Sequence, residues 1–280
     1  MTVKTILVTG ATSGIGKQVL KSLAIQGHKL IVIARCPEKI KLTINEVKND
    51  APNTVIYSYV ADFSDVDSVT QVAQKISTNH PVIDVLINNA GAMHMKEEVA
   101  KCGREKTLVV NHISHAALTL ALINNLKLAS QGCIINVSSD CYRLPGYDLN
   151  CSDFDGKYNW NKAYNRSKLA QIQFTHVLQD KLNSDNIVVT SVSPGGVKTD
   201  IYRALPKIAR WLVSLTLKPV ERGVDDILKI ANLEDASMFA GQFVSKGKVK
   251  TVEQKFLSPA VLTENWQIST NRLATENFAV

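Results

Sequence analysis

Short runs of apolar and β-branched residues alternate along this chain with longer segments of helical periodicity. The strand-like runs are 5–8, 30–33, 55–57, 82–87, 133–137 and 187–190. The longest helical segments lie around Thr107–Leu128 and Lys162–Leu182. Near-continuous apolar strands that are each followed by a helix predict a parallel sheet covered on both faces. The preference for right-handed crossovers then favours a doubly wound α/β sheet.

The chain shows no boundary between domains. No stretch rich in Pro, Gly or Ser divides it, and its 280 residues suffice for one large domain, so we expect residues 1–280 to form a single domain. With 45% hydrophobic and 20% charged residues, the composition excludes a disordered, collagen-like or coiled-coil chain. The chain contains no run of about eighteen apolar residues, so no membrane-spanning helix is predicted, and no secretory signal is expected.

The chain has a modest basic excess, with 32 Lys and Arg against 25 Asp and Glu, a formal charge of +7. Such an excess suits a phosphate-bearing ligand, an anionic membrane surface or nucleic acid, and selects none of them. Because the basic residues are dispersed, we do not expect nucleic-acid binding. The five cysteines are an odd set without a CxxC pair, which predicts reduced thiols in a cytoplasmic protein.

A glycine-rich turn joins the first strand to the first helix. Its sequence is TGATSGIG at 9–16, with GxxxGxG spacing. Glycines here let the backbone approach a pyrophosphate, while free amides and the positive end of the new helix face the anion. Although glycines can also simply end a strand, this position favours a dinucleotide site. Its predicted residues are Gly10, Thr12, Ser13, Gly14, Ile15 and Gly16.

The end of the second strand bears on the choice of dinucleotide. A site that prefers NAD usually has an acidic residue here, which binds the ribose 2′-hydroxyl. In this chain Arg35 stands at that point, and no Asp or Glu follows until Glu38. Arg35, with Lys17 after the last glycine, can bind a 2′-phosphate, so we predict NADP(H) in preference to NAD(H). In the alternative interpretation, both cations are solvated surface residues.

Further short motifs follow in order. They are NNAG at 88–91, VNH around Asn111, NVSS at 136–139, YNRSK at 164–168 and PGGVKT at 194–199. Together with the glycine-rich turn, they make the sequence resemble the short-chain dehydrogenase/reductase family, whose members have a compact Rossmann fold. The resemblance covers roughly residues 3–245 and implies an oxidoreductase that uses a nicotinamide cofactor.

The YNRSK motif suggests a proton donor. Tyr164 and Lys168 are four residues apart in a helical segment, so their side chains share one face, about 5–6 Å apart at Cβ. The reference pKa of a phenol, about 10, is too high for ready proton exchange near neutrality, and a neighbouring ammonium lowers it. We therefore predict Tyr164 as the acid of carbonyl reduction and the base of alcohol oxidation. Alone, this spacing would also suit an exposed polar helix face.

A serine hydroxyl at the carboxyl end of the strand at 133–137 can donate to a substrate carbonyl oxygen. The resemblance assigns this role to Ser139, with Ser138 as the alternative. It also implies that Asn111 holds a water in a proton relay through Lys168. An asparagine early in a helix can equally have a structural role, but the VNH context favours the functional one.

The remaining cofactor contacts are implied by the family alone. Asp62 would lie against the adenine, Asn89 and Gly91 along the adenosine side, and Asn88 would brace the sheet. Tyr164 and Lys168 would also contact the nicotinamide ribose. The residues implied around the nicotinamide amide are Pro194, Gly195, Val197 and Thr199.

Two segments resemble the retinol-dehydrogenase-like branch of the family, which includes the WW-domain oxidoreductase. They are VVNHISHAALT at 109–119 and SPAVLTENWQIST at 258–270, and a separation of 25 residues between Ser139 and Tyr164 accompanies them. The branch implies an apolar alcohol or carbonyl substrate, such as a retinoid, steroid or lipid aldehyde, and a closing segment at about 251–280. Many of its members have an N-terminal membrane anchor, which we do not expect here, and family members are often homo-oligomers.

An apolar stripe with helical spacing follows PGGVKT and consists of Ile201, Leu205, Ile208, Leu212 and Leu215. Its position favours a substrate lid at about 195–218, while an ordinary packed helix and a helix in contact with a membrane surface stay open. His112 and His115 are three residues apart, as metal ligands can be. No third ligand is evident, so no metal is predicted.

These patterns predict an NADP(H)-dependent oxidoreductase of apolar alcohols or carbonyls. One alternative is a catalytically silent NADP(H)-binding sensor or scaffold. Such proteins usually lose the tyrosine, the lysine or a loop glycine, and all are present here. A protochlorophyllide-reductase-like enzyme shares the motifs, but its additional pigment-site cysteines have no clear counterpart in this chain.

Overall fold

The computed structural model describes residues 2–143, 157–197 and 217–271, and its centre is one eight-stranded sheet. The strands are β1 (Thr5–Thr9), β2 (Lys29–Ala34), β3 (Ile56–Val60), β4 (Val85–Asn88), β5 (Gly132–Val137), β6 (Ile187–Ser193), β7 (Phe243–Ser245) and β8 (Lys248–Lys250). Their order is β3-β2-β1-β4-β5-β6-β7-β8, and β8 alone pairs antiparallel. The predicted doubly wound parallel sheet is confirmed.

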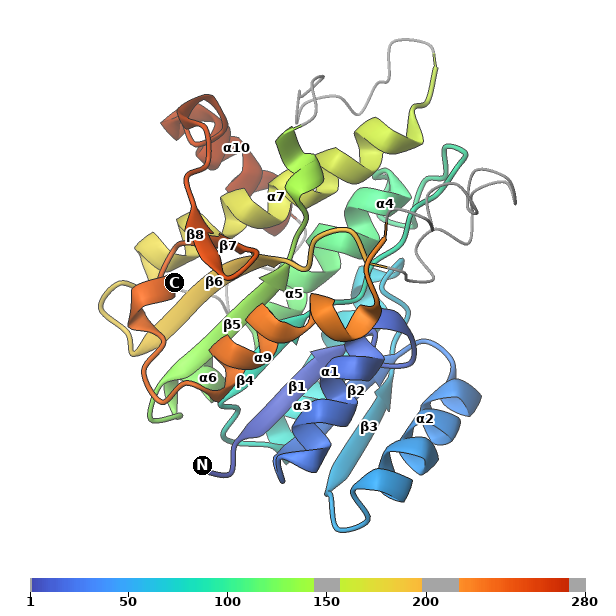
Figure 1. Cartoon of the computed structure of the whole chain (residues 1–280). Coiled ribbons are helices and arrows are strands. Elements are labelled where there is room, and N and C mark those ends of the chain that lie inside the picture. The colour runs from blue at the N-terminus through green and yellow to red at the C-terminus, as the bar shows by residue number, and fades with distance from the viewer. Residues whose placement is uncertain (1, 144–156, 198–216, 272–280) are drawn as a thin grey trace.

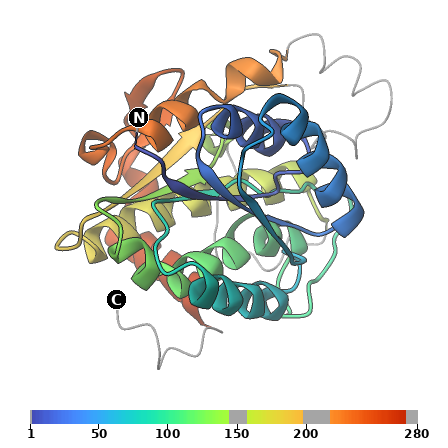
Figure 2. The ribbon, with the colours of Figure 1, turned by 90° about the horizontal axis from the view of Figure 1, so that it is seen from below.

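Helices cover both faces of the sheet (Figures 1 and 2). One face carries α1 (Gly14–Ile25), α2 (Pro37–Asp50) and α9 (Asp225–Asn232). The other carries α3 (Val66–Asn79), α5 (Ser114–Ala121) and α7 (Trp160–Lys181), with α10 (Pro259–Thr270) packed on α7 and α5. Short helical segments are α4 (Lys106–Leu108), a π-helical turn (Val109–Ile113), α6 (Ile123–Lys127) and 3₁₀ turns at Asp140–Arg143, Val220–Gly223, Ser237–Phe239 and Gln254–Phe256.

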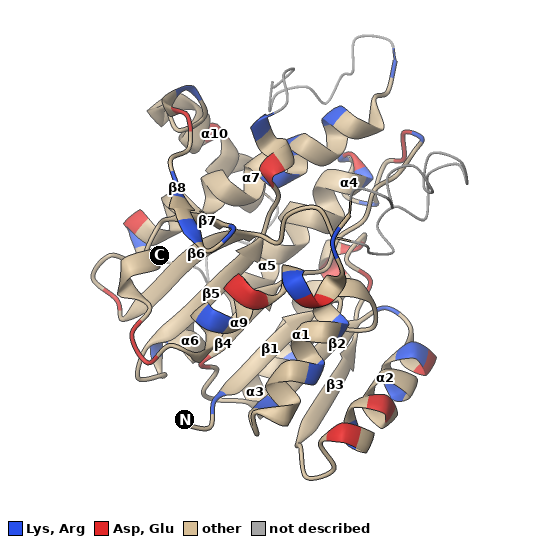
Figure 3. Cartoon of the chain, viewed as in Figure 1, with Lys and Arg blue, Asp and Glu red and all other residues tan. Residues whose placement is uncertain are grey.

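Strand β1 shows why the central strands are apolar at every position. Leu7 packs with α3, α5 and α7, whereas Ile6 and Val8 pack with α1 and α9. All three are fully buried, as expected for a strand covered on both faces. Charged residues lie mainly on the outer helices and loops, and α2 carries both signs (Figure 3). The basic excess is thus spread over the described surface.

Periodicity missed two features of the fold. Strands β7 and β8 have three residues each, too few to establish a two-residue repeat. The single long helix expected around Thr107–Leu128 consists instead of α4, the π-helical turn, α5 and α6. A π-helical turn is rare and often marks a functional site, and the apolar pattern does not reveal it.

The C-terminal helix α10 is held against the layer formed by α5 and α7. Trp266 stacks on Phe174, with ring centroids 6.0 Å apart and an interplanar angle of 12°. The Lys181 ammonium lies 4.7 Å from the Trp266 ring centroid. Deeper in this contact, Ser269 Oγ lies 2.7 Å from His112 Nε2.

The residue before β1 is tied to a distant part of the chain. Lys4 Nζ donates to the backbone oxygens of Ala231, at 3.0 Å, and Leu233, at 2.5 Å. These acceptors lie at the end of α9 and directly after it. The central strand is therefore fixed at its start by residues that come more than two hundred positions later.

Candidate active site

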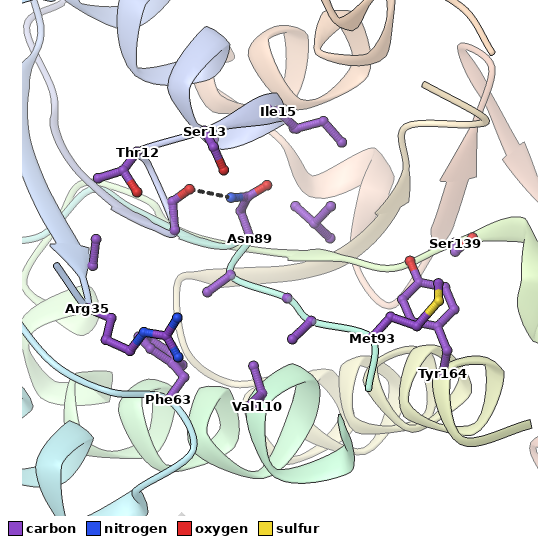
Figure 4. Close-up of a pocket in the computed structure, with 18 of the residues that line it drawn as sticks. Thr12, Ser13, Ile15, Arg35, Phe63, Asn89, Met93, Val110, Ser139 and Tyr164 are labelled. Atoms are coloured by element: carbon purple, nitrogen blue, oxygen red, sulfur yellow. Dashed lines mark hydrogen bonds between the residues drawn. The ribbon is translucent and has the colours of Figure 1, made fainter. Parts of the chain in front are cut away.

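The carboxyl ends of the strands border a cavity of about 450 Å³ near the point where the strand order reverses, between β1 and β4. Open α/β sheets bind ligands at such a reversal. Figure 4 shows Arg35 and Phe63 at one end of this cavity and Ser139, Tyr164 and Met93 at the other. The predicted residues that line it are Gly10, Thr12, Ser13, Gly14, Ile15, Gly16, Arg35, Asp62, Asn89, Gly91, Ser139, Tyr164, Lys168, Pro194, Gly195 and Val197.

The loop between β1 and α1 has a backbone suited to glycine. Gly10 and Gly14 have φ of 67° and 50°, in the left-handed region. A Cβ on Gly16 would lie 2.4 Å from Asn89 Nδ2 and 2.5 Å from the Gly10 backbone oxygen. Because Gly16 has no side chain, the start of α1 packs closely against Gly10 and Asn89, and this end of the helix borders the cavity. This cradle fits a pyrophosphate group.

Asn89 holds this loop in place. Its Nδ2 donates to the Thr9 backbone oxygen at 2.8 Å, and Figure 4 shows its side chain directed at the loop. The backbone amides of Asn89 and Ala90 both donate to Thr9 Oγ1 at 2.9 Å. The preceding residue, Asn88, donates to Asn136 Oδ1 on β5 at 2.9 Å. The NNAG turn thus fixes the nucleotide loop on one side and the sheet on the other.

The two serines after β5 differ in their hydrogen bonds. The buried Ser138 donates its hydroxyl proton to the Lys168 backbone oxygen at 2.6 Å. Ser139 Oγ accepts from the Cys141 amide at 3.2 Å and lines the catalytic end of the cavity (Figure 4). Since Ser138 uses its single proton inside the fold, Ser139 is the better placed of the two to donate to a ligand.

Helix α7 presents Tyr164 and Lys168 to the cavity. The Asn159 side chain caps the start of the helix. Lys168 Nζ lies 5.7 Å from the Tyr164 ring centroid and donates to the Val137 backbone oxygen at 2.8 Å and to Gln171 Oε1 at 3.0 Å. Burial lowers the pKa of Lys168 to about 7. A lysine with this pKa can exchange a proton near neutrality.

Asn111 lies in the π-helical turn and joins two parts of the site. Its Oδ1 accepts from the Ala92 amide at 2.7 Å, and its Nδ2 donates to the Ala92 oxygen at 3.0 Å and to Ser167 Oγ at 2.9 Å. Ser167 Oγ in turn donates to the Tyr164 backbone oxygen at 2.7 Å. Asn111 is fully buried behind the cavity wall, so its side chain connects the NNAG segment to α7. Its part in a proton relay stays a prediction.

The end of the cavity near β2 is basic. Arg35 directly follows β2, and Lys39, which also lines the cavity, follows one helical turn later on α2. Among the described lining residues, Asp62 is the only acidic one, and its carboxylate accepts from the Ser64 amide at 2.9 Å. Lys17 lies elsewhere, because its ammonium is paired with Glu46 of α2. The structure therefore does not bring Lys17 together with Arg35.

The family follows from the sequence as a whole. Residues 4–208 match the protein family described as short chain dehydrogenase. The chain belongs to the short-chain dehydrogenase family.

The short-chain dehydrogenase is similar to retinol dehydrogenases. It shares 30% identity over 272 residues with human retinol dehydrogenase 11, covering 96% of this chain and 86% of the relative. With human retinol dehydrogenase 13 it shares 33% identity over 218 residues, covering 78% and 66%. The expected retinol-dehydrogenase-like branch is confirmed, and with it an oxidoreductase.

Solved structures support the fold. YwfH, an NADPH-dependent reductase involved in bacilysin biosynthesis, matches with a TM-score of 0.74 and 21% identity over 90% of this chain and 100% of that chain. A short chain dehydrogenase from Shigella flexneri in complex with NADP matches with a TM-score of 0.68 and 24% identity, covering 86% and 96%.

Several residues that line the cavity of this short-chain dehydrogenase were not predicted from the sequence. They include Lys39, Phe63, Met93 and His94. Burial lowers the pKa of His94. Phe63 directly follows Asp62, Met93 and His94 lie two and three residues after the NNAG motif, and Lys39 is one helical turn after Arg35. Their short distances in sequence from predicted site residues are the signal that could have identified them.

Some predicted features lie outside the described residues. They are Thr199, the apolar stripe at 201–215 and most of the lid expected at 195–218. Of the described part of that lid, Val197 pairs with Lys218 through an isolated β-bridge. Pro194, Gly195 and Val197 line the cavity, as noted above.

The two histidines that are three residues apart, His112 and His115, are both buried and bond to groups that form no metal site. His112 Nε2 meets Ser269 Oγ, and His115 lies between the Asn111 backbone oxygen and Thr9 Oγ1. Across the described residues, no three His, Cys, Asp or Glu side chains gather as a metal site would require. None of the helices in the described ranges has the length and apolar character needed to cross a bilayer.

Proposed function

We propose that this short-chain dehydrogenase transfers a hydride between NADP(H) and an apolar alcohol or carbonyl compound. The observation that carries the proposal is a single cavity with Arg35 at one end and Ser139, Tyr164 and Lys168 at the other. The nicotinamide cofactor, when bound, donates or accepts the hydride.

In carbonyl reduction, the Tyr164 hydroxyl gives its proton to the substrate oxygen, and in alcohol oxidation the phenolate takes it back. The Ser139 hydroxyl donates a hydrogen bond to the same oxygen and stabilises the negative charge that develops there. The Lys168 ammonium stabilises the phenolate. With its pKa near 7, Lys168 can also pass a proton onward to a water, and the residue that we propose holds this water is Asn111.

The preference for NADP(H) rests on charge. Arg35 offers a planar guanidinium for a 2′-phosphate, and Lys39 adds a second cation one helical turn away. Asp62, the one acidic residue among the described lining residues, is bonded to its own turn. A 2′-phosphate would therefore meet positive charge at this end.

The apolar substrate class rests on the other end. Met93 lies at the same end of the cavity as Tyr164 (Figure 4), and Val197 also lines the cavity. The named relatives are retinol dehydrogenases, which supports a retinoid, steroid or lipid aldehyde as the substrate. We also propose a cytoplasmic location, supported by the free thiols of the four described cysteines.

The first experiment is a titration of the purified protein with NADPH and NADH, followed by turnover with a panel of apolar aldehydes and ketones. Tyr164→Phe should keep NADPH binding and reduce turnover about 10²–10⁴-fold, because it removes only the proton donor. Ser139→Ala should reduce turnover, whereas Ser138→Ala should mainly reduce stability. Tight NADPH binding with no turnover of any carbonyl would favour a sensor or scaffold instead.

A second experiment tests the cofactor preference. Arg35→Ala should weaken NADPH binding about tenfold or more and leave NADH binding nearly unchanged, because only NADPH has the 2′-phosphate. Lys41→Ala, an exposed cation on the same helix as Lys39 but outside the cavity, is the matched control. Equal losses for both dinucleotides in Arg35→Ala would contradict the assignment.

A further inference from the structure

His115 is a buried residue for which the proposed chemistry has no role. It lies on α5, four residues after Asn111, and is 2% exposed. Its Nδ1 is 3.0 Å from the Asn111 backbone oxygen, and its Nε2 is 3.0 Å from Thr9 Oγ1. Its ring also contacts Phe63, with centroids 4.7 Å apart. The side chain therefore stands directly behind both the nucleotide loop and the catalytic π-helical turn.

The hydrogen-bond partners fix the tautomer of His115. A carbonyl oxygen only accepts, so Nδ1 carries the proton and donates to the Asn111 oxygen. Burial lowers the pKa of His115 to about 3, so the ring is neutral at physiological pH and Nε2 is an acceptor. The Thr9 hydroxyl then donates to Nε2. Its other acceptor within reach, the Ile87 backbone oxygen, is more distant at 3.4 Å.

With its proton directed to His115, Thr9 Oγ1 has its lone pairs free for the amides of Asn89 and Ala90. One chain of hydrogen bonds therefore runs from the NNAG turn through Thr9 and His115 to Asn111. Every donor in it has a defined acceptor, and a buried network of this kind resists displacement of any one member.

We propose that His115 is a positioning residue that couples the cofactor loops to the catalytic turn. Through Nε2 it orients Thr9 and hence the NNAG turn, and through Nδ1 it holds the Asn111 carbonyl. Asn111 in turn holds Ser167, which bonds to the backbone of Tyr164. The proposal rests on the proposed function, because it assigns His115 to the service of that site.

The two halves of this connection can be separated by substitution. In His115→Asn, the amide nitrogen falls near the position of Nδ1, so it can donate to the Asn111 oxygen but does not reach Thr9. In His115→Gln, the amide oxygen falls near the position of Nε2, so it can accept from Thr9 but the side chain no longer donates to the Asn111 oxygen. We would measure the Kd for NADPH, kcat for decanal at saturating NADPH, and the Tm of each variant.

His115→Asn should raise the Kd for NADPH about tenfold and keep kcat within about twofold of wild type. His115→Gln should do the reverse, with kcat reduced about tenfold and the Kd kept. Thr9→Val, an isosteric change that removes the hydroxyl, should reproduce the raised Kd for NADPH. The double variant Thr9→Val/His115→Asn should have a Kd little higher than that of either single variant. It also serves as the second variant if a histidine replacement fails to fold.

The matched control is His112, the other buried histidine of this segment, which bonds to α10 instead. His112→Asn and His112→Gln should lower the Tm, and neither should change the Kd for NADPH selectively or kcat selectively. If the His115 variants also change Kd and kcat in the same proportion, His115 is merely structural and the proposal is overturned. If wild type fails to bind NADPH, or if Tyr164→Phe keeps full turnover, the proposed function fails instead. If NADPH binds but decanal is not reduced, the Kd values of the two His115 variants alone decide.

Discussion

The buried ammonium of Lys168 should give the stability of this protein a distinct dependence on pH. Its pKa falls from 10.5 to about 7 because burial disfavours the charged form. A difference of one in pKa corresponds to about 1.4 kcal/mol, so the difference between 10.5 and 7 corresponds to about 5 kcal/mol of lost stability when the lysine is charged.

The sign follows from proton binding. Below pH 7 both the native and the unfolded chain hold the proton, and the native state bears the full cost. Between pH 7 and 10.5 the unfolded chain binds more protons, so the free energy of unfolding rises with pH. From pH 7 to 9.5 this one group should add about 3 kcal/mol. Above 10.5 its contribution no longer changes.

The assay is urea unfolding at several pH values, for wild type and for Lys168→Met. Methionine leaves the Val137 and Gln171 oxygens without their donor, at a cost of about 1–3 kcal/mol for each group that does not depend on pH. The diagnostic quantity is therefore how the difference in the free energy of unfolding between wild type and Lys168→Met changes with pH. The size of that difference at a single pH is not diagnostic. From pH 7 to 9.5, the free energy of unfolding of wild type should rise relative to that of Lys168→Met. The control is Lys248→Met, at an exposed position on β8, whose free energy of unfolding should change with pH as wild type does. A flat difference for Lys168→Met would refute the reasoning.

Two further substitutions test the packing around the site. Gly16→Ala should lower the free energy of unfolding by about 1–3 kcal/mol and weaken NADPH binding, because the new Cβ would lie 2.4 Å from Asn89 Nδ2. Unfolding curves and an NADPH titration would show this, and native affinity would contradict it. Trp266→Ala should lower the free energy of unfolding by about 2–3 kcal/mol through loss of its stack on Phe174, less than for a fully buried tryptophan. NADPH affinity should stay unchanged, and a loss of under about 0.5 kcal/mol would argue that the stack contributes little.

The parts of the fold that could be predicted from sequence are those with a long repeat or a local motif. Strands such as β1 and β5 are covered on both faces, so their uninterrupted apolar runs are visible without the structure. Four of the six predicted site motifs, TGATSGIG, NNAG, NVSS and PGGVKT, lie at the carboxyl end of a strand, and parallel strands bring these ends to one edge of the sheet. This is why Gly10, Asn89 and Ser139 line one cavity although they are far apart in sequence.

The parts that could not be predicted depend on partners that are distant in the chain. Lys17 follows the last loop glycine, but Glu46, on the neighbouring helix, draws it away from the cavity. The difference between Ser138 and Ser139 appears only when the Lys168 carbonyl is seen to accept from the first. In the sequence, His115 is notable only for its spacing of three residues from His112, because Thr9, its second partner, lies 106 residues earlier.

The link from Lys4 to the end of α9 also bears on how the chain folds during synthesis. At about 5–20 residues per second, the ribosome adds Ala231 roughly 11–45 s after Lys4, from their separation of 227 positions. Strand β1 lies in the middle of the sheet, and one of its neighbours, β4, is paired through Ile6 and Val85. The nucleotide loop is thus made early but gains its complete support late. During that interval β1 lacks the two hydrogen bonds from Lys4, and the cavity gains its last described lining residue, Val197, 187 positions after Gly10.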